Sequence, residues 1–200
     1  MAIEWSPVTE VDGVDEGREQ RRREAISALT HTPTEELVAS RAQLQAAAHD
    51  AGLSSEEIQA VLNARPELPR PLLPSERETL LAILGHADFE GRDELVAQVD
   101  STAVSAYWGC GCASVNFQVE PGAPRALSTP SPIPNEALIL DADGESIGGI
   151  IVFLDDGYLS CIDVHDWLDD AHGISPLPPP DRLVLVEPSD RKGGVYRPSS

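Results

Sequence analysis

The sequence predicts an α+β protein in which helices pack on an antiparallel β-meander sheet. The runs 137–140, 147–154 and 158–164 are rich in β-branched and large apolar residues, as strands are. Asp143-Gly144 and Asp156-Gly157 separate these runs, and Asp-Gly between apolar runs is a strong hairpin signal because both residues tolerate the positive φ of a type I′ turn. Helix-start patterns, by contrast, lie in the first half of the chain. The chain is therefore expected to be helical first and mainly β later.

An N-terminal helical hairpin is expected over residues 25–64. Its first helix follows Pro33 and continues through Ala-rich sequence to about Asp50. Ser54 and Glu57 then form a capping box, which opens a second and shorter helix with apolar residues on one face.

Composition divides the remaining chain. Residues 1–24 mix charged residues with few apolar ones, which predicts an N-terminal arm that is mobile or only partly helical. Residues 65–74 carry four prolines, which forbid a helix and favour an extended spacer, so we place a Pro-rich linker and a domain boundary there. Residues 75–187 form the expected α+β domain, and residues 188–200 a disordered tail.

The α+β domain is expected to open with two helices. Ser75 and Glu78 form a second capping box for a helix ending near Gly85, and a further helix covers 91–99. Three further strands are expected, over 103–108, 114–120 and 182–186.

The charge of the chain limits its partners. It carries 34 acidic and 14 basic residues, a net charge of -20. Such a charge repels the phosphate backbone and anionic lipid surfaces, so neither nucleic acid nor membrane is an expected partner. A basic protein is the partner that this charge favours, although acidic surfaces also serve solubility alone. The lack of a long apolar run or signal peptide, together with an odd cysteine count of three, predicts a cytoplasmic location.

Four residues are candidate zinc ligands: Cys110, Cys112, Cys161 and His165. Flanking glycines let the two sulfurs of Cys-Gly-Cys approach one ion, but this spacing is not that of a zinc knuckle, so buried core cysteines remain the alternative. A disulfide between Cys110 and Cys112 is not expected, since so small a ring is strained and no thioredoxin-like βαβ pattern surrounds it. A thiol dyad with His165 is a further option. No cofactor is expected, with zinc as the alternative.

The end of the meander is acidic and carries the candidate partner-binding residues, which are Asp163, Asp166, Trp167, Asp169 and Asp170. Asp166 and Asp170 share a face at helical spacing, so a divalent ion or a solvated helix start are alternative interpretations.

The chain from about Leu72 to Pro178 resembles a set of uncharacterised bacterial α+β proteins. The matching pieces are a capped helix at 73–84, a Phe-x-Gly-Arg-x-Glu-Leu helix at 89–95, a Cys-Gly-Cys hairpin at 109–114 and an Asp-Gly hairpin with an aromatic-acidic end at 156–167. The resemblance implies the α+β fold and no particular activity.

No P-loop, GxGxxG, GxSxG or HExxH motif is present. The leading expectation is therefore a non-enzymatic, acidic interaction protein of the immunity or inhibitor type, which binds a basic protein. The alternative is a metal-binding or thiol-dependent enzyme that uses the cysteine and histidine cluster. The sequence leaves the oligomeric state open.

Overall fold

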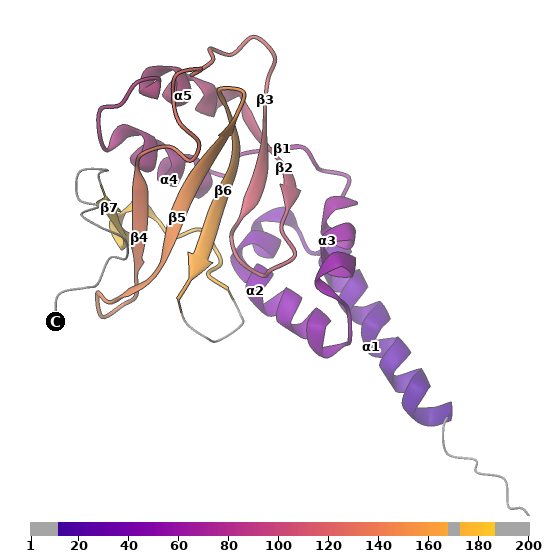
Figure 1. Ribbon diagram of the computed structural model, residues 1–200. Coiled ribbons are helices and arrows are strands. Elements are labelled where there is room, and N and C mark those ends of the chain that lie inside the picture. The colour runs from indigo at the N-terminus through magenta and orange to yellow at the C-terminus, as the bar shows by residue number, and fades with distance from the viewer. Residues whose placement is uncertain (1–11, 168–172, 187–200) are drawn as a thin grey trace, which may run out of the picture.

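A computed structural model describes residues 12–167 and 173–186 of the chain. Within them, five α-helices and a seven-stranded antiparallel sheet confirm the α+β class (Figure 1). The helices are α1 (Asp12–His31), α2 (Thr34–Asp50), α3 (Ser55–Asn63), α4 (Pro74–Gly85) and α5 (Arg92–Gln98). The strands are β1 (Arg70–Pro71), β2 (Thr102–Tyr107), β3 (Val115–Val119), β4 (Glu136–Leu140), β5 (Ser146–Asp155), β6 (Tyr158–Asp166) and β7 (Leu183–Val186).

The meander is confirmed, because β4, β5 and β6 are neighbours in the strand order β1-β2-β3-β6-β5-β4-β7. Asp156 and Gly157 have φ angles of 50° and 79°, as the predicted turn requires. The other turn is built differently, since only Gly144 has a positive φ and Asp141 Oδ1 accepts hydrogen bonds from the backbone of Asp143 and Glu145. An Asx turn therefore connects β4 to β5.

Helices α4 and α5 cover one face of the sheet. In Figure 1, α4 and α5 lie behind β4, β5 and β6. Their buried leucines and isoleucines share one core with Ile150 and Val152 of β5, both 0% exposed. Leu29, Leu37 and Ile58 of the first three helices belong to the same core. The hydrophobic core is thus continuous across the expected domain boundary.

Within residues 65–74, Arg70 and Pro71 join the sheet, so this part of the segment is not the free spacer that the sequence predicts. Arg70 and Pro71 form β1, which pairs antiparallel with β2, a place where proline is tolerated because it lies at an edge. Arg70 is 4% exposed, and its guanidinium donates to both carboxylate oxygens of Glu76 at 2.7 Å and to the Tyr107 hydroxyl at 2.8 Å. This buried ion pair fixes the segment in place.

Of the two alternatives for the N-terminal arm, residues 12–24 agree with the helical one, because they belong to α1. Gln20 donates to Glu24 and Arg23 to Glu19 one turn apart, and Arg22 reaches Glu57 of α3 at 2.7 Å. Contact with α3 therefore gives α1 stability that its local sequence does not supply. The predicted hairpin is accordingly a three-helix unit, and residues 1–11 and the predicted tail at 188–200 lie outside the described residues.

The helix starts match the sequence in part. The Ser54 capping box is confirmed, with Glu57 N donating to Ser54 Oγ at 3.2 Å and Ser54 N to Glu57 Oε2 at 2.8 Å. The box predicted at Ser75 is wrong. Helix α4 begins two residues earlier than that box requires, because Leu73 is the N-cap and Glu76, not Glu78, accepts the hydrogen bond from the backbone of Leu73.

The outer edge of β2 is covered at both ends. β1 pairs with it at Ala103 and Val104. At the other end the Asn63 side chain acts like a short strand, accepting from Tyr107 N at 2.8 Å and donating to Tyr107 O at 3.3 Å. No helix among residues 12–167 and 173–186 combines the length and apolarity needed to span a membrane.

Candidate functional site

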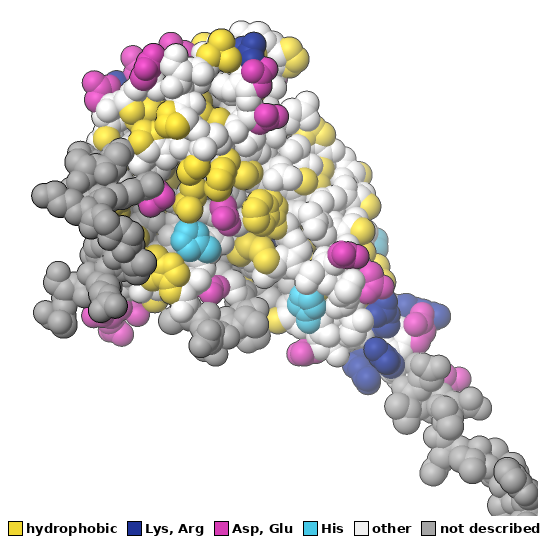
Figure 2. All heavy atoms as spheres, viewed as in Figure 1, with side chains coloured by type: hydrophobic (Ala, Val, Ile, Leu, Met, Phe, Trp, Pro, Cys, Tyr) yellow, Lys and Arg dark blue, Asp and Glu magenta, His cyan; other side chains and the backbone are white. Residues whose placement is uncertain are grey.

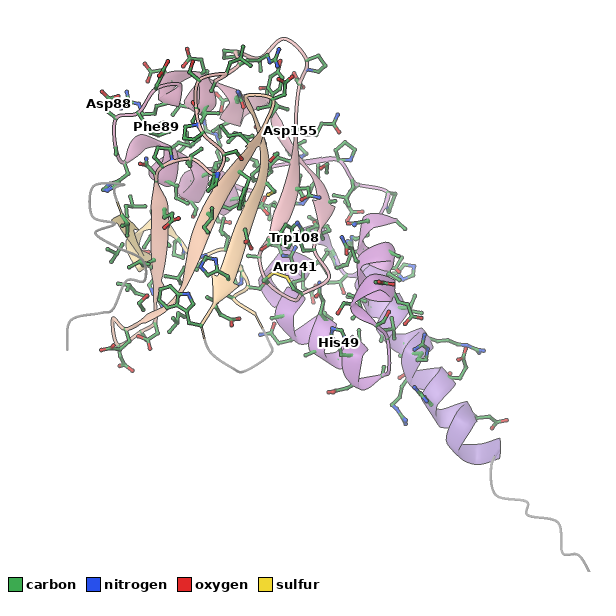
Figure 3. All side chains as sticks on the ribbon, viewed as in Figure 1. Arg41, His49, Asp88, Phe89, Trp108 and Asp155 are labelled. Carbon is green, nitrogen blue, oxygen red and sulfur yellow. A yellow bond between two sulfur atoms is a disulfide. The ribbon has the colours of Figure 1, made fainter. Side chains whose placement is uncertain are left out.

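The loop between β2 and β3, residues 108–114, contains Cys-Gly-Cys and is the centre of the candidate site. Helix α2 holds it from below, because Arg41 Nη2 donates to Ser114 O at 3.0 Å and Gln45 Nε2 to Trp108 O at 3.3 Å (Figure 3). Ala113 N donates to Ile174 O at 2.7 Å. The loop is therefore tied to the body on two sides.

Cys110 and Cys112 form a disulfide, which corrects the expectation that they would not pair. Gly111 between them has a φ of 79°, a conformation open to glycine, and so lets the chain reverse within one residue. Gly109 lies against α3, where a Cβ would come 2.4 Å from Ser55 O. Glycines on either side of Cys110 thus permit the bridge that spacing alone made unlikely.

Two open pockets flank the disulfide. One, of about 370 Å³, is lined by residues that include Trp108, both bridged cysteines, Asp163, His165 and Asp166. The other, of about 450 Å³, is lined on the α3 side by Ser55, Glu56 and Gln59 and also contacts Trp108 and Cys110. We call the first the disulfide pocket. This pocket brings together residues predicted as zinc ligands and residues predicted to bind a partner protein.

Ser114 connects the disulfide to β6. Its side chain is buried, and its Oγ accepts from Val164 N at 2.8 Å. The same oxygen lies 3.3 Å from Cys112 Sγ and 3.3 Å from Asp163 Oδ1. The Ser114 hydroxyl can therefore direct its proton to the sulfur, to the carboxylate or to Val164 O, which lies 3.4 Å away.

Strands β5 and β6 present one face that no described helix covers. Register pairs Gly149 with His165, Ile151 with Asp163, and Phe153 with Cys161 on this face. Trp167, 48% exposed, follows with its ring centroid 6.3 Å from that of His165. We call this the open face. Figure 2 shows hydrophobic side chains over these strands with histidine and acidic side chains among them, and Lys and Arg only at the margins of the view.

The structure does not assemble the predicted zinc ligands. Cys110 and Cys112 bind each other, and Cys161, which pairs with Asn116 and Phe153, lies four residues before His165 on β6, with Asp163 between them on the same face. In the described part of the chain, no group of three or more His, Cys, Asp and Glu is placed to hold a metal ion. Zinc stays a prediction that this oxidised arrangement does not support, since a ligating cysteine must be a thiolate.

The predicted partner-binding residues divide into two sets. Asp163 and Asp166 line the disulfide pocket, and Trp167 extends the open face. Asp169 and Asp170 lie outside the described residues.

Arg41, which sequence reasoning missed, is the most deeply buried charged group near the loop. It is 1% exposed, and its guanidinium stacks on the Tyr107 ring at 5.1 Å. Burial lowers the pKa of Arg41 to about 10, partly offset by Tyr107 and Glu76, so the group stays charged near neutral pH. Trp108 and Ser114 were missed too, and their adjacency to Cys-Gly-Cys was the signal that could have found them.

Cys161, the free cysteine, should react slowly with alkylating agents. Burial, and second the charge of Asp163, raise the pKa of its thiol and so reduce the thiolate fraction. We expect Asp163→Asn to speed alkylation by iodoacetamide at pH 8, because removing the charge of Asp163 lowers the pKa of the Cys161 thiol and so raises its thiolate fraction. Asp166→Asn is the control and should leave the rate unchanged. Equal rates in both variants would show that Asp163 does not act on Cys161.

Comparisons with known proteins gave no match to a family model, a curated protein or a solved structure.

Proposed function

We propose that this chain is an acidic interaction protein of the inhibitor or immunity type, which docks a basic protein on the open face. The observation that carries the proposal is the combination of apolar strands, which no helix in the described part of the chain covers on this face, with one sign of charge. Residues 126–181, which include the whole meander, contain eleven Asp and Glu and no Lys or Arg. The opposite face of the same strands is packed into the core.

The open face has the composition of a docking surface. Ile151, Phe153 and Trp167 supply apolar area, and tryptophan is among the residues that contribute most to binding energy. Asp163 and Asp166 lie beside them at the disulfide pocket. A partner with basic side chains around an apolar centre would meet complementary charge on this face. Desolvation of the charged rim would cost little binding free energy.

The test uses the full chain as bait. A partner captured from lysate of the source cells is identified, purified and titrated against the wild type and two variants. We expect a basic partner whose dissociation constant rises with salt, and Trp167→Ala should weaken binding by about 30-fold, the effect of losing about 2 kcal/mol at a hot spot.

The matched control is Leu127→Ala. Leu127 is 67% exposed and lies near Gly157, at the end of β6 remote from Trp167. The affinity of the Leu127→Ala variant for the partner should equal that of the wild type. Equal loss in both variants, an acidic partner, or binding indifferent to salt would each overturn the proposal. So would a self-dimer in sedimentation that Trp167→Ala dissociates, because the open face would then belong to a second copy.

A further inference from the structure

The Cys110–Cys112 bridge differs from a structural disulfide in its position. It closes a loop of one intervening residue, so it joins no distant parts of the chain and restricts the unfolded state little. The loop is already held by Arg41, Gln45 and Ile174. In the reducing compartment that the sequence predicts, disulfides are usually transient and serve redox chemistry.

The two cysteine residues are unequally exposed. Cys110 is exposed and lines both pockets, whereas Cys112 is 7% exposed. An incoming thiolate therefore has room to reach Cys110, with Trp108 as an apolar wall between the pockets. Attack on one sulfur makes the other the leaving group.

The surroundings of Cys112 suit a leaving thiolate. Ser114 Oγ lies 3.3 Å from Cys112 Sγ, close enough to donate its proton to a sulfur that has gained negative charge. Ser114 is fixed for this by the hydrogen bond from Val164 N. His165 lines the same pocket and can supply a proton.

From this geometry we propose that Cys110–Cys112 is a thiol–disulfide exchange site for small thiols, with Cys110 as the attacked sulfur. The thiolate forms a bond to Cys110 Sγ, the bond to Cys112 breaks, and its electron pair leaves on Cys112 Sγ, which takes a proton. A second thiol then attacks the mixed disulfide and releases Cys110. Two thiols are oxidised to one disulfide while the protein disulfide gains two electrons and two protons.

Charge selects the thiol. Asp163 and Asp166 line the pocket, and the chain has a net charge of -20. A cationic thiol is therefore attracted and an anionic one repelled. This surface chemistry distinguishes the site from one built for glutathione, which carries a net negative charge.

The first test traps the attacked sulfur. Full-length Cys112→Ser and Cys110→Ser proteins are each treated with cystamine, and the mixed disulfide is located by peptide mass spectrometry, with Cys161 as the internal reference. We expect Cys110 to be modified about tenfold faster than Cys112, since access controls exchange. Equal rates, or faster modification of Cys112, would overturn the assignment.

The second test uses the wild-type chain after oxidation. It is reduced by cysteamine, 2-mercaptoethanol and glutathione, each normalised to its rate on hydroxyethyl disulfide. We expect the normalised rates to fall in that order and to converge in the Asp163→Asn, Asp166→Asn double variant. Free thiols at both cysteines after treatment of the reduced protein with cystamine would overturn the exchange site, and a normalised rate with glutathione above that with cysteamine would overturn its charge selection. Neither result depends on whether the open face binds a partner.

Discussion

Glu76→Gln should destabilise the protein by about 3 kcal/mol, because it leaves the buried Arg70 guanidinium without its counter-charge. Arg70 is 4% and Glu76 7% exposed, and the two meet through paired hydrogen bonds of 2.7 Å. Burial opposes the charged form of Arg70, but the hydrogen bonds and charge of Glu76 outweigh it and raise the pKa of Arg70. Urea denaturation followed by far-ultraviolet circular dichroism measures the loss.

Glu78→Gln is the matched control. Glu78 lies two residues further along α4 and is exposed, so its substitution should change the free energy of unfolding by less than about 0.5 kcal/mol. Replacing both buried partners, Arg70→Met with Glu76→Leu, should restore much of the loss, since no uncompensated charge remains. A Glu76→Gln protein as stable as the wild type would mean that the ion pair contributes nothing.

Gly109→Ala should destabilise the protein by about 1–3 kcal/mol, the usual cost of forcing an atom into a packed site. The added Cβ would lie 2.4 Å from Ser55 O, and a backbone carbonyl of α3 cannot move aside as a flexible side chain can. The loop should shift away from α3, so the fluorescence of the neighbouring Trp108 should change as well. Thermal unfolding and tryptophan emission measure the two effects.

Gly85→Ala provides the comparison for the same chemical change. Gly85 ends α4, and nothing lies within 4 Å of a Cβ placed there. This variant should be neutral or more stable by up to about 1 kcal/mol, because alanine restricts the unfolded chain more than glycine does. If both glycine variants behaved alike, contact between the loop and α3 would not constrain the site.

The meander could be predicted because its signals are local. Apolar runs and Asp156-Gly157 lie within one continuous stretch, and each specifies its own conformation. Helix α1 and strand β1 could not be predicted, since their partners lie far away. Arg22 of α1 meets Glu57 after 35 positions, and β1 pairs with Val104. The composition shows only that these segments are charged or Pro-rich, and it does not indicate which distant elements they contact.

The candidate site, like the fold, could be predicted from the sequence only in part. Cys110, Cys112, Asp163 and His165 were recognised by residue type, but not their grouping in one pocket. Strand register and the loop conformation decide that grouping. The buried support was missed because Arg41 and Ser114 lie 73 positions apart. Residue type predicted the reactive groups, and tertiary contacts decided which of them meet.

The short strand β1 also has a consequence for the handling of this protein. A chain that lacks residues 1–71 would lose both β1 and Asn63, the two groups that cover the outer edge of β2. The unpaired amides and carbonyls of β2 would then form a template for intermolecular strand pairing and aggregation. The helical half of the chain thus prevents the sheets of two copies from pairing through β2.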